Sequence, residues 1–307
     1  GQGTNYFNPV YVRYDLDGNE LSFDFHGSNN EHGLNDITKL SNDFYCVTGP
    51  LYPSSHNFLA TIDVNFDVVN ILSLTQYIYG WGQGKLVNDE ENNIYVIGLD
   101  NETTPSAIRA SKYNGDLELQ WTQVYTDITN VDINDVVYNE GKITIAGQNN
   151  LVGDAYVLQV DTLGILNWEL TIDSGNSDYT RVNGIINVED GYLISVQYYT
   201  DSSTEFSKIH HVSETGEDTG NHLLFDSQAF VAYGMEFVGN DLFISGSIDG
   251  NIPALTKIQI SPQDIVYGCT DSLAGNYNPE ADFDDGSCEY PDNGDYSLSF
   301  DGEDDYV

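Results

Sequence analysis

The amino-acid sequence predicts an all-β protein in which one four-stranded unit repeats along most of the chain. Two observations support this fold class. A short run of β-branched and aromatic residues returns at almost constant spacing, and helical periodicity of apolar residues is absent throughout. Four short strands in each repeat of roughly 40–50 residues are typical of a β-propeller blade.

The recurring run is clearest in Gly141–Gly147, which reads Gly-Lys-Ile-Thr-Ile-Ala-Gly. Related runs end at these positions: Gly49, Gly98, Gly147, Val196 and Gly246. The intervals between these ends are 49, 49, 49 and 50 residues. A fixed period in this range indicates a repeat architecture. A β-helix would need shorter rungs, and a sandwich would not repeat with this regularity.

Within one unit, turn-forming residues separate four strand-like segments. In the first full unit these segments are Leu34–Leu40, Phe44–Gly49, Phe58–Asp63 and Val68–Leu74. Asn, Asp, Gly and Pro gather between them because these residues tolerate or preset turn dihedrals.

The strand count predicts five complete units and one partial unit. The last complete unit comprises Tyr233–Val238, Leu242–Gly246, Ala254–Ile260 and Asp264–Val266. The partial unit supplies only Val10–Asp15 and Glu20–Phe25, and the chain opens on what resembles the tail of another copy. We therefore expect residues 1–266 to form a β-propeller of six four-stranded blades, the first incomplete in this chain. Roughly 15 residues upstream would complete it. A seventh blade further upstream is the alternative.

The charge balance restricts the partners. The net charge is −40, from 49 acidic and 9 basic residues. Nucleic acid and anionic membrane surfaces are poor partners for such a chain, because phosphate binding needs Lys and Arg. No run of 18 apolar residues is present, so we expect no direct membrane insertion. Large negative charge keeps a protein soluble and attracts cations.

The first strand of each blade should line the central channel, where blades meet. Aligned polar residues there form the candidate channel lining: Asn35, Asp36, Gln83, Asn134, Asp135, Asn183 and Tyr233. One interpretation is a ring of ligands for a bound molecule or cation. The interpretation we favour is that small and polar residues are required where the channel narrows and water enters.

Catalytic patterns are weak. With 49 acidic residues, a carboxylate pair of the kind used by glycosidases can be found by chance. The six histidines show no metal-ligand spacing, and neither a nucleophile elbow nor a phosphate-binding glycine loop occurs. Trp81, Trp121 and Trp168 could stack on sugars, but packing is favoured because two of them fall on outer strands. Cys46 lies within a strand and is expected to be a buried small hydrophobe.

Two resemblances extend this interpretation. The turn Asp161-Thr-Leu-Gly164, followed by Leu166-Asn-Trp168, resembles bacterial β-propeller repeats, and this likeness covers about residues 1–266. It implies the fold and no activity. Residues 267–290, which begin Tyr-Gly-Cys-Thr-Asp and end Asp-Asp-Gly-Ser-Cys-Glu-Tyr, resemble a Cys-bounded repeat found between domains of large secreted bacterial surface proteins.

The remaining residues, 291–307, are interpreted as a linker followed by the first strand of another domain. Tyr-Ser-Leu-Ser-Phe-Asp-Gly-Glu-Asp-Asp-Tyr-Val resembles the opening strand of a laminin-G or concanavalin-A-like lectin domain. Together the two C-terminal resemblances imply a secreted or cell-surface bacterial protein, of which this chain is one part.

For the Cys-bounded module we expect a disulfide between Cys269 and Cys288 and a bound calcium ion. Closing a loop of this size stabilises the fold by about 3 kcal/mol in the chain-entropy model. The segment has too little apolar surface to fold unaided. Calcium takes several oxygen ligands, and the candidates are Asp271, Asn276, Asn278, Asp282, Phe283 (through its carbonyl), Asp284 and Asp285. The alternative is a solvated acidic turn that relies on the disulfide alone.

The function that these patterns favour is a non-enzymatic binding or display module, an adhesin for glycans or a surface protein. Two alternatives remain: a secreted polysaccharide-degrading enzyme with its site in the propeller channel, and a structural subunit of an extracellular filament.

Overall fold

The computed structural model describes these residues: 10–14, 20–25, 34–40, 43–51, 56–75, 84–100, 102–103, 105–149, 153–173, 179–199, 206–224, 230–239, 241–248, 252–258, 268–279, 281 and 287–290. Twenty-one β-strands and no helix occur among them, which confirms the all-β prediction.

The strands form six antiparallel sheets, each made of strands that follow one another in sequence. In chain order the sheets are β1 (Val10–Tyr14) and β2 (Glu20–Phe25); β3 (Asp36–Lys39), β4 (Tyr45–Leu51), β5 (His56–Ile62) and β6 (Val68–Leu74); β7 (Gly84–Asn88), β8 (Ile94–Leu99), β9 (Ala107–Tyr113) and β10 (Leu119–Thr129); β11 (Val131–Asn139), β12 (Lys142–Asn149), β13 (Ala155–Asp161) and β14 (Leu166–Ile172); β15 (Tyr179–Val188), β16 (Gly191–Tyr199), β17 (Phe206–Ser213) and β18 (Asp218–Leu224); β19 (Phe230–Val238), β20 (Asp241–Ile248) and β21 (Ile252–Ile258).

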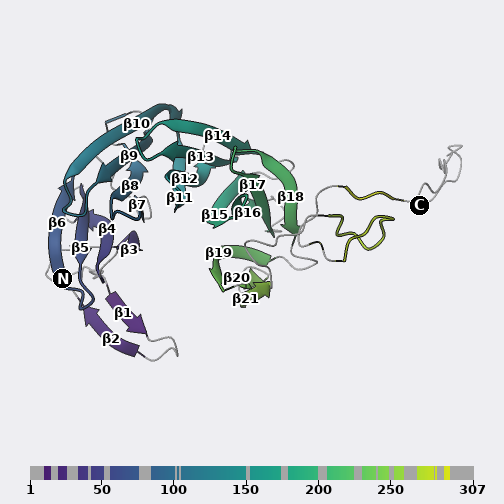
Figure 1. Ribbon diagram of the computed structural model, residues 1–307, viewed down its shortest axis with the longest axis horizontal. Helices are drawn as coiled ribbons and strands as arrows, with labels where there is room; N and C mark the ends of the chain where they lie inside the picture. The colour runs from purple at the N-terminus through teal and green to yellow at the C-terminus, as the bar shows by residue number, and fades with distance from the viewer. Residues whose placement is uncertain are drawn as a thin grey trace, which may run out of the picture.

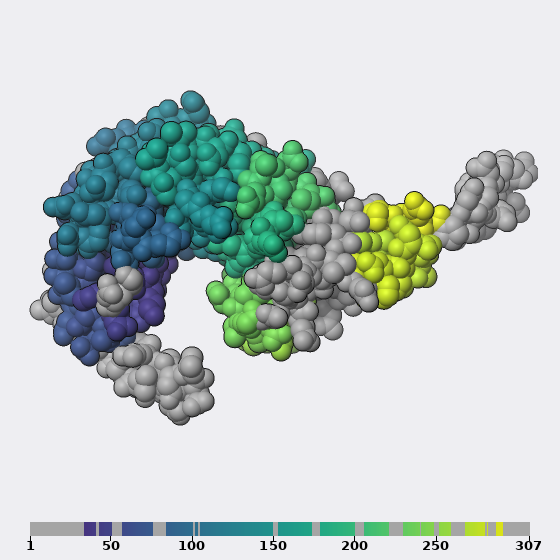
Figure 2. Space-filling model, in the orientation of Figure 1, coloured from purple at the N-terminus to yellow at the C-terminus, as the bar shows by residue number. Residues whose placement is uncertain are grey.

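The sheets stand side by side in an arc, which is the arrangement of propeller blades (Figure 1). The first strands β3, β7, β11, β15 and β19 face the centre of the arc, and each contacts the next. The fourth strands β6, β10, β14 and β18 form the outer rim (Figure 1). The space-filling view shows the central opening that the arc surrounds (Figure 2).

The strand predictions agree with the structure within the described residues. All four segments of the first full unit are present as β3 to β6, and both strands of the partial unit are present as β1 and β2. The expected strand Asp264–Val266 lies outside the described residues. The number of blades therefore stays a prediction.

The hydrophobic core lies between consecutive sheets, because a four-stranded sheet on its own leaves both faces in water. Most buried residues lie on the second and third strands, and every residue of β8 is buried. In the largest cluster, Ile97 and Ile108 of one sheet pack with Ile143 and Leu158 of the next. Cys46 belongs to another such cluster and is fully buried, as expected. Its burial raises the pKa of the thiol to about 12.

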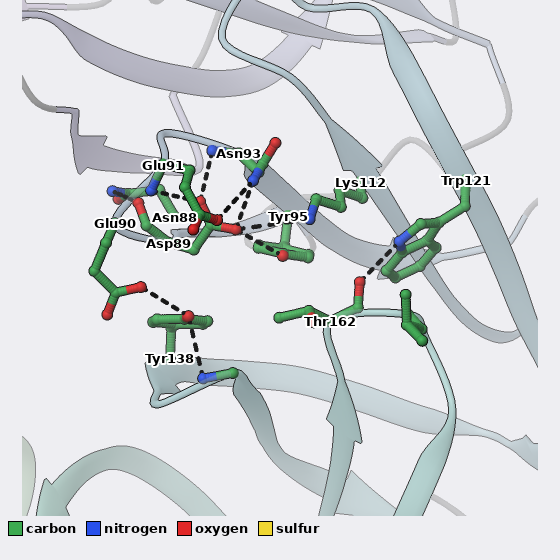
Figure 3. Close-up of polar contacts among 12 residues, drawn as sticks. Asn88, Asp89, Glu90, Glu91, Asn93, Tyr95, Lys112, Trp121, Tyr138 and Thr162 are labelled. Atoms are coloured by element: carbon green, nitrogen blue, oxygen red, sulfur yellow. Dashed lines mark hydrogen bonds and ion pairs between the residues drawn. The ribbon is translucent and has the colours of Figure 1, made fainter.

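Two tryptophans join neighbouring blades at the outer rim. The indole N–H of Trp121 on β10 donates to the carbonyl oxygen of Thr162 in the β13–β14 turn, at 3.0 Å (Figure 3). The indole N–H of Trp168 on β14 donates in the same way to the carbonyl oxygen of Glu214, at 3.0 Å. The predicted packing role of these two residues is confirmed. Trp81 lies outside the described residues.

Each indole rests against a turn glycine that has a left-handed backbone. Gly164 has φ +81° and Gly216 has φ +83°. A Cβ atom at Gly216 would lie 2.4 Å from the Trp168 ring, and one at Gly164 would lie 3.0 Å from Trp121. The turn glycine therefore serves both the backbone conformation and the close approach of the ring.

We expect Gly216→Ala to lower the free energy of unfolding by about 2–3 kcal/mol, from left-handed strain together with the clash against Trp168. Gly220→Ala is the matched control, because Gly220 has φ +79° and open space where a Cβ would lie. It should cost only about 1 kcal/mol. Urea unfolding measures both values, and equal losses in the two variants would contradict the packing role of this glycine.

Residues 268–290 form a module in which the described residues contain no strand. Cys269 and Cys288 are joined by a disulfide with a Cα–Cα distance of 4.8 Å, which confirms the predicted pairing. Asn276 ties the two arms together, since its side chain donates to the carbonyl of Ser287 and accepts from the amide of Glu289.

Candidate functional site

Three first strands carry a β-bulge at the same place. The pairing with the second strand skips one residue between Ile133 and Asp135, between Val182 and Gly184, and between Ala232 and Gly234. The skipped residues are Asn134, Asn183 and Tyr233. A bulge changes the direction of a side chain, and it brings these three predicted channel residues to one cavity.

This cavity, which we call the Tyr233 cavity, has a volume of about 420 Å³. Its lining residues are Asn134, Arg181, Asn183, Gln197, Tyr199 and Tyr233. The amide of Asn183 is held in place, because it donates to Gln197 Oε1 at 3.0 Å and to the carbonyl of Ala232 at 2.7 Å. The side-chain oxygen of Asn134 is buried and has no hydrogen-bond donor.

Two tyrosines give the Tyr233 cavity aromatic surfaces. The ring of Tyr233 is 52% exposed although its hydroxyl is hydrogen-bonded to Ser247 Oγ at 3.0 Å. The ring of Tyr199 is stacked on Tyr179, with centroids 4.1 Å apart. Both rings are therefore fixed by contacts behind the cavity, which leaves little conformational entropy to lose when a ligand binds.

The Tyr233 cavity also contains one of the few cations of this acidic protein. Arg181 is exposed, and within the described part of the chain no carboxylate pairs with it. Other basic residues are neutralised locally, such as Lys112 by Asp89 and Lys142 by Glu214. An arginine offers up to five N–H donors in a fixed plane.

A second cavity, which we call the Asp135 cavity, has a volume of about 410 Å³. It is lined by Asp36, Ile37, Thr38, Leu86, Val87, Asn88, Asp135, Val136, Val137, Tyr138 and Asn187. These residues come from the first strands of four successive blades.

The two carboxylates of the Asp135 cavity connect one blade to the next. Asp36 accepts the backbone N–H of Leu86, and Asp135 accepts that of Ile185, at 2.7 and 3.0 Å. The other oxygen of each carboxylate accepts the N–H of the following residue in its own strand, at 2.9 Å in both cases. Each carboxylate thus accepts two backbone hydrogen bonds, one from its own strand and one from the next blade.

Burial raises the pKa of both carboxyl groups. Loss of hydration is the largest influence on Asp36 and on Asp135, and the backbone N–H donors and the charge of Lys85 oppose it. The charge of Asp36 also raises the pKa of Asp135, so the two groups lie close enough to interact. Raised carboxyl pKa values in a cleft occur in catalytic sites and in structural networks alike.

The predicted channel lining is thus divided between two cavities. Asn134, Asn183 and Tyr233 line one, and Asp36 and Asp135 line the other. The side-chain nitrogen of Asn35 is buried without an acceptor, and Gln83 lies outside the described residues.

The prediction missed Arg181, Gln197 and Tyr199, which complete the Tyr233 cavity. Arg181 could have been found, because alternate residues of a strand share a face and it lies two positions before Asn183. The position of Tyr199 depends on the pairing of β15 with β16.

The calcium candidates can be placed only in part. Asp282, Phe283, Asp284 and Asp285 lie outside the described residues. Asp271 accepts hydrogen bonds from the Tyr290 hydroxyl at 2.7 Å and the Leu273 amide at 2.8 Å, and these bonds lower its pKa. Asn278 donates its backbone N–H to the carbonyl of Cys269 at 2.9 Å. The side-chain oxygens of Asp271 and Asn276 thus accept hydrogen bonds from within the module itself.

Other candidate chemistry is limited in the part of the chain that the structure describes. No group of three or more His, Cys, Asp or Glu is placed to hold a metal ion there. No helix that is long and apolar enough to cross a membrane occurs within the same residues. His210 and His211 are buried, and each is hydrogen-bonded to a different carboxylate, Asp218 and Asp190 respectively.

Comparison with known proteins identifies the fold and no family. No protein-family model and no curated protein matches the chain. A structure of Kuenenia stuttgartiensis hydrazine synthase is similar with a TM-score of 0.51 at 13% identity, over 78% of this chain and 70% of that one.

Two further solved structures have lower scores. The Dos1 propeller has a TM-score of 0.48 at 9% identity, over 82% of this chain and 65% of that one. A structure of Drosophila Plexin A in complex with Semaphorin 1b has a TM-score of 0.47 at 10% identity, over 74% of this chain and 51% of that one. This chain therefore spans about half of the last protein.

The raised pKa values predict how stability changes with pH. A carboxyl group whose pKa is higher in the folded protein holds its proton more tightly there, so its contribution to stability falls as pH rises from 3.8 to the raised pKa. The double variant Asp36→Asn, Asp135→Asn lacks this dependence.

The unfolding free energy of the double variant, measured relative to the natural protein, should therefore increase across that window. Urea unfolding at a series of pH values tests it. The comparison cancels the charge repulsion that the two proteins share, and a difference that does not change with pH would refute the assignment.

Proposed function

We propose that this chain is a non-enzymatic, glycan-binding display module of a larger secreted or cell-surface bacterial protein. The observation that carries the proposal is the Tyr233 cavity, where two tyrosine rings held by contacts, three amide side chains and an arginine without a carboxylate partner among the described residues converge.

The lining of this cavity suits a sugar. A pyranose ring has apolar C–H faces that pack on aromatic rings, and hydroxyl groups around its edge that both donate and accept hydrogen bonds. Tyr199 and Tyr233 offer the rings. Asn134 offers a buried oxygen that lacks a donor, and Arg181 offers N–H groups for sugar oxygens.

The carboxylates of the Asp135 cavity support a binding function over catalysis. All four oxygens of Asp36 and Asp135 accept backbone hydrogen bonds, and two of these bonds join neighbouring blades. A general acid or base needs an oxygen that can reach the substrate.

A secreted polysaccharide-degrading enzyme is the second candidate, favoured by the raised pKa values of two interacting carboxyl groups in one cavity. Hydrolysis of a polysaccharide by the purified protein, and its loss in the Asp36→Asn, Asp135→Asn variant, would replace the first proposal by this one.

The disulfide between Cys269 and Cys288 supports a location outside the cytosol, since such bonds persist in oxidising compartments. The net charge of −40 favours a well-solvated surface. Display on a larger chain is supported by the resemblance of residues 267–290 to an inter-domain repeat.

Binding to a glycan array tests the proposal. Tyr233→Ala and Arg181→Ala should each weaken binding of the captured glycan about tenfold, which corresponds to about 1.4 kcal/mol for one lost contact. Tyr277→Ala is the matched control, since Tyr277 is an exposed tyrosine of the Cys-bounded module. Absence of binding across the array, or equal loss in all three variants, would contradict a sugar site at Tyr233.

We also propose that the Cys-bounded module binds calcium through Asp282, Asp284 and Asp285. Under non-reducing conditions, a chelator should accelerate proteolysis between residues 267 and 290, because calcium holds oxygen-rich loops in one conformation. The variant Asp282→Asn, Asp284→Asn should be cleaved quickly with or without the chelator. Cleavage of the natural protein at one rate in both conditions would leave the disulfide as the sole constraint.

A further inference from the structure

At the outer rim, the fourth strand of one blade contacts a turn of the next blade, and we call this contact a junction. The three junctions made by β6, β10 and β14 can be compared residue by residue. The register between the third and fourth strand shifts once in the first and third junctions and twice in the second. The shift common to all three lies near the start of the fourth strand, where one residue of that strand is skipped. Counting from that shift, Asn70 is equivalent to Trp121 and Trp168. The first junction therefore has an asparagine where the next two have the indole that joins the blades.

Two further residues differ at the first junction. The strand partner of Asn70 is Thr61, where Trp121 pairs with Lys112 and Trp168 with Gln159. Thr61 therefore has a shorter side chain than the equivalent residues of the other two junctions, as Asn70 does. In the second junction, Lys112 extends toward the polar network around Asp89, and Trp121 extends toward the carbonyl of Thr162 (Figure 3).

The third change is in the facing turn. Leu117 donates its N–H to the carbonyl of Asn114, as Gly164 and Gly216 do in their turns, and it has φ +62°. Leucine is rare in this left-handed conformation, which costs about 1–2 kcal/mol. Its side chain is buried with the apolar residues between the first two full blades.

Together these exchanges leave a cavity of about 320 Å³, which we call the Asn70 groove. It is lined by Leu40, Phe44, Thr61, Val69, Asn70, Asn92, Gly115 and Asp116. The groove opens to solvent, since Phe44 is 37% and Val69 51% exposed. One wall is apolar and the rest carries hydroxyl, amide, carboxylate and peptide groups.

The hydroxyl of Thr61 indicates a ligand. Thr61 is only 4% exposed, it lines the groove, and its Oγ1 has no hydrogen-bond partner among the residues that the structure describes. A buried hydroxyl without a partner is unfavourable, and such groups in folded proteins need an explanation. Gly115, which is equivalent in its turn to the indole acceptors Thr162 and Glu214, lines the same groove.

The shape of the groove favours a sugar over a flat aromatic ring. The ring of Trp168 lies so close to Gly216 that a Cβ atom there would clash with it. Leu117 occupies the equivalent turn position and has a Cβ atom, so an indole in the same place would clash. A pyranose can instead pack one face on Phe44 and direct hydroxyls to Thr61, Asn70 and Asp116. Among the described residues no Lys or Arg lines the groove, so these residues offer an acidic sugar no counter-charge.

We propose that the Asn70 groove binds one neutral pyranose ring. This site lies between the first two full blades, whereas the Tyr233 cavity is built by β11, β15, β16 and β19, so the two sites are separate. One module would then hold a polysaccharide at two places, which raises the overall affinity when a chain can reach both.

The test uses the full chain and a panel of methyl glycosides of glucose, galactose and mannose, followed by NMR saturation transfer and titration. At least one should bind. The double variant Asn70→Trp, Leu117→Gly recreates the tryptophan–glycine pair of the next two junctions, so it should fold normally and lose that binding. Thr61→Val removes the hydroxyl with little change of shape and should weaken binding about tenfold.

Tyr233→Ala separates this inference from the proposed function. It should leave binding of the methyl glycoside to the Asn70 groove unchanged while it weakens glycans held at the Tyr233 cavity. The inference is overturned if no neutral glycoside binds, if binding persists in Asn70→Trp, Leu117→Gly, or if Tyr233→Ala abolishes it. Binding of free indole in place of the glycosides would also overturn it.

Discussion

Burial of each sheet against the next is the constraint on which this architecture depends. A four-stranded sheet has two faces, and only a neighbour on each side can remove both from water. The apolar clusters accordingly join consecutive sheets, as when Ile97 packs with Ile143. Polar contacts follow the same rule. Asp36 and Asp135 bind backbone donors of the following blade, and the indoles of Trp121 and Trp168 reach the following turn.

Each junction has a similar space to fill between two blades. A difference between repeats on one side of a junction is therefore accompanied by a difference on the other side. Tryptophan on the fourth strand accompanies glycine in the facing turn, at Trp168 and Gly216 for example. Where the strand carries Asn70, the turn carries Leu117, which fills part of the interior from the other side. The compensation is incomplete, since it leaves the Thr61 hydroxyl buried and without a partner in the described part of the chain. In a repeat protein, one irregular junction can thus be recognised by comparison with the equivalent junctions of the same chain.

The sequence predicted the strands well because their determinants are local. Alternating apolar runs and turn residues mark β3 to β6 within a few residues of their observed limits. The candidate site was harder to predict. Asn134, Asn183 and Tyr233 could be aligned by the repeat, and Arg181 could have been added from its place two residues before Asn183, whereas Tyr199 joins them only through strand pairing. The roles of Asp36 and Asp135 depend on which backbone amides face them, a property of the assembled blades.

We expect a ligand to bind such a fold at the bulges of the first strands and at a junction that departs from the repeat. Regular positions are occupied by packing and by hydrogen bonds between blades, so their side chains have little capacity left for a ligand. The bulge residues differ, because a skipped residue has no strand partner and its side chain is directed out of the pleat. Tyr233 illustrates the outcome, with its hydroxyl held by Ser247 and half of its surface free. Asn70 is the converse case, in which a side chain too short for its position exposes groups that other junctions cover. Both places put apolar surface beside polar atoms that have no partner among the described residues, and this combination suits a hydroxylated ring.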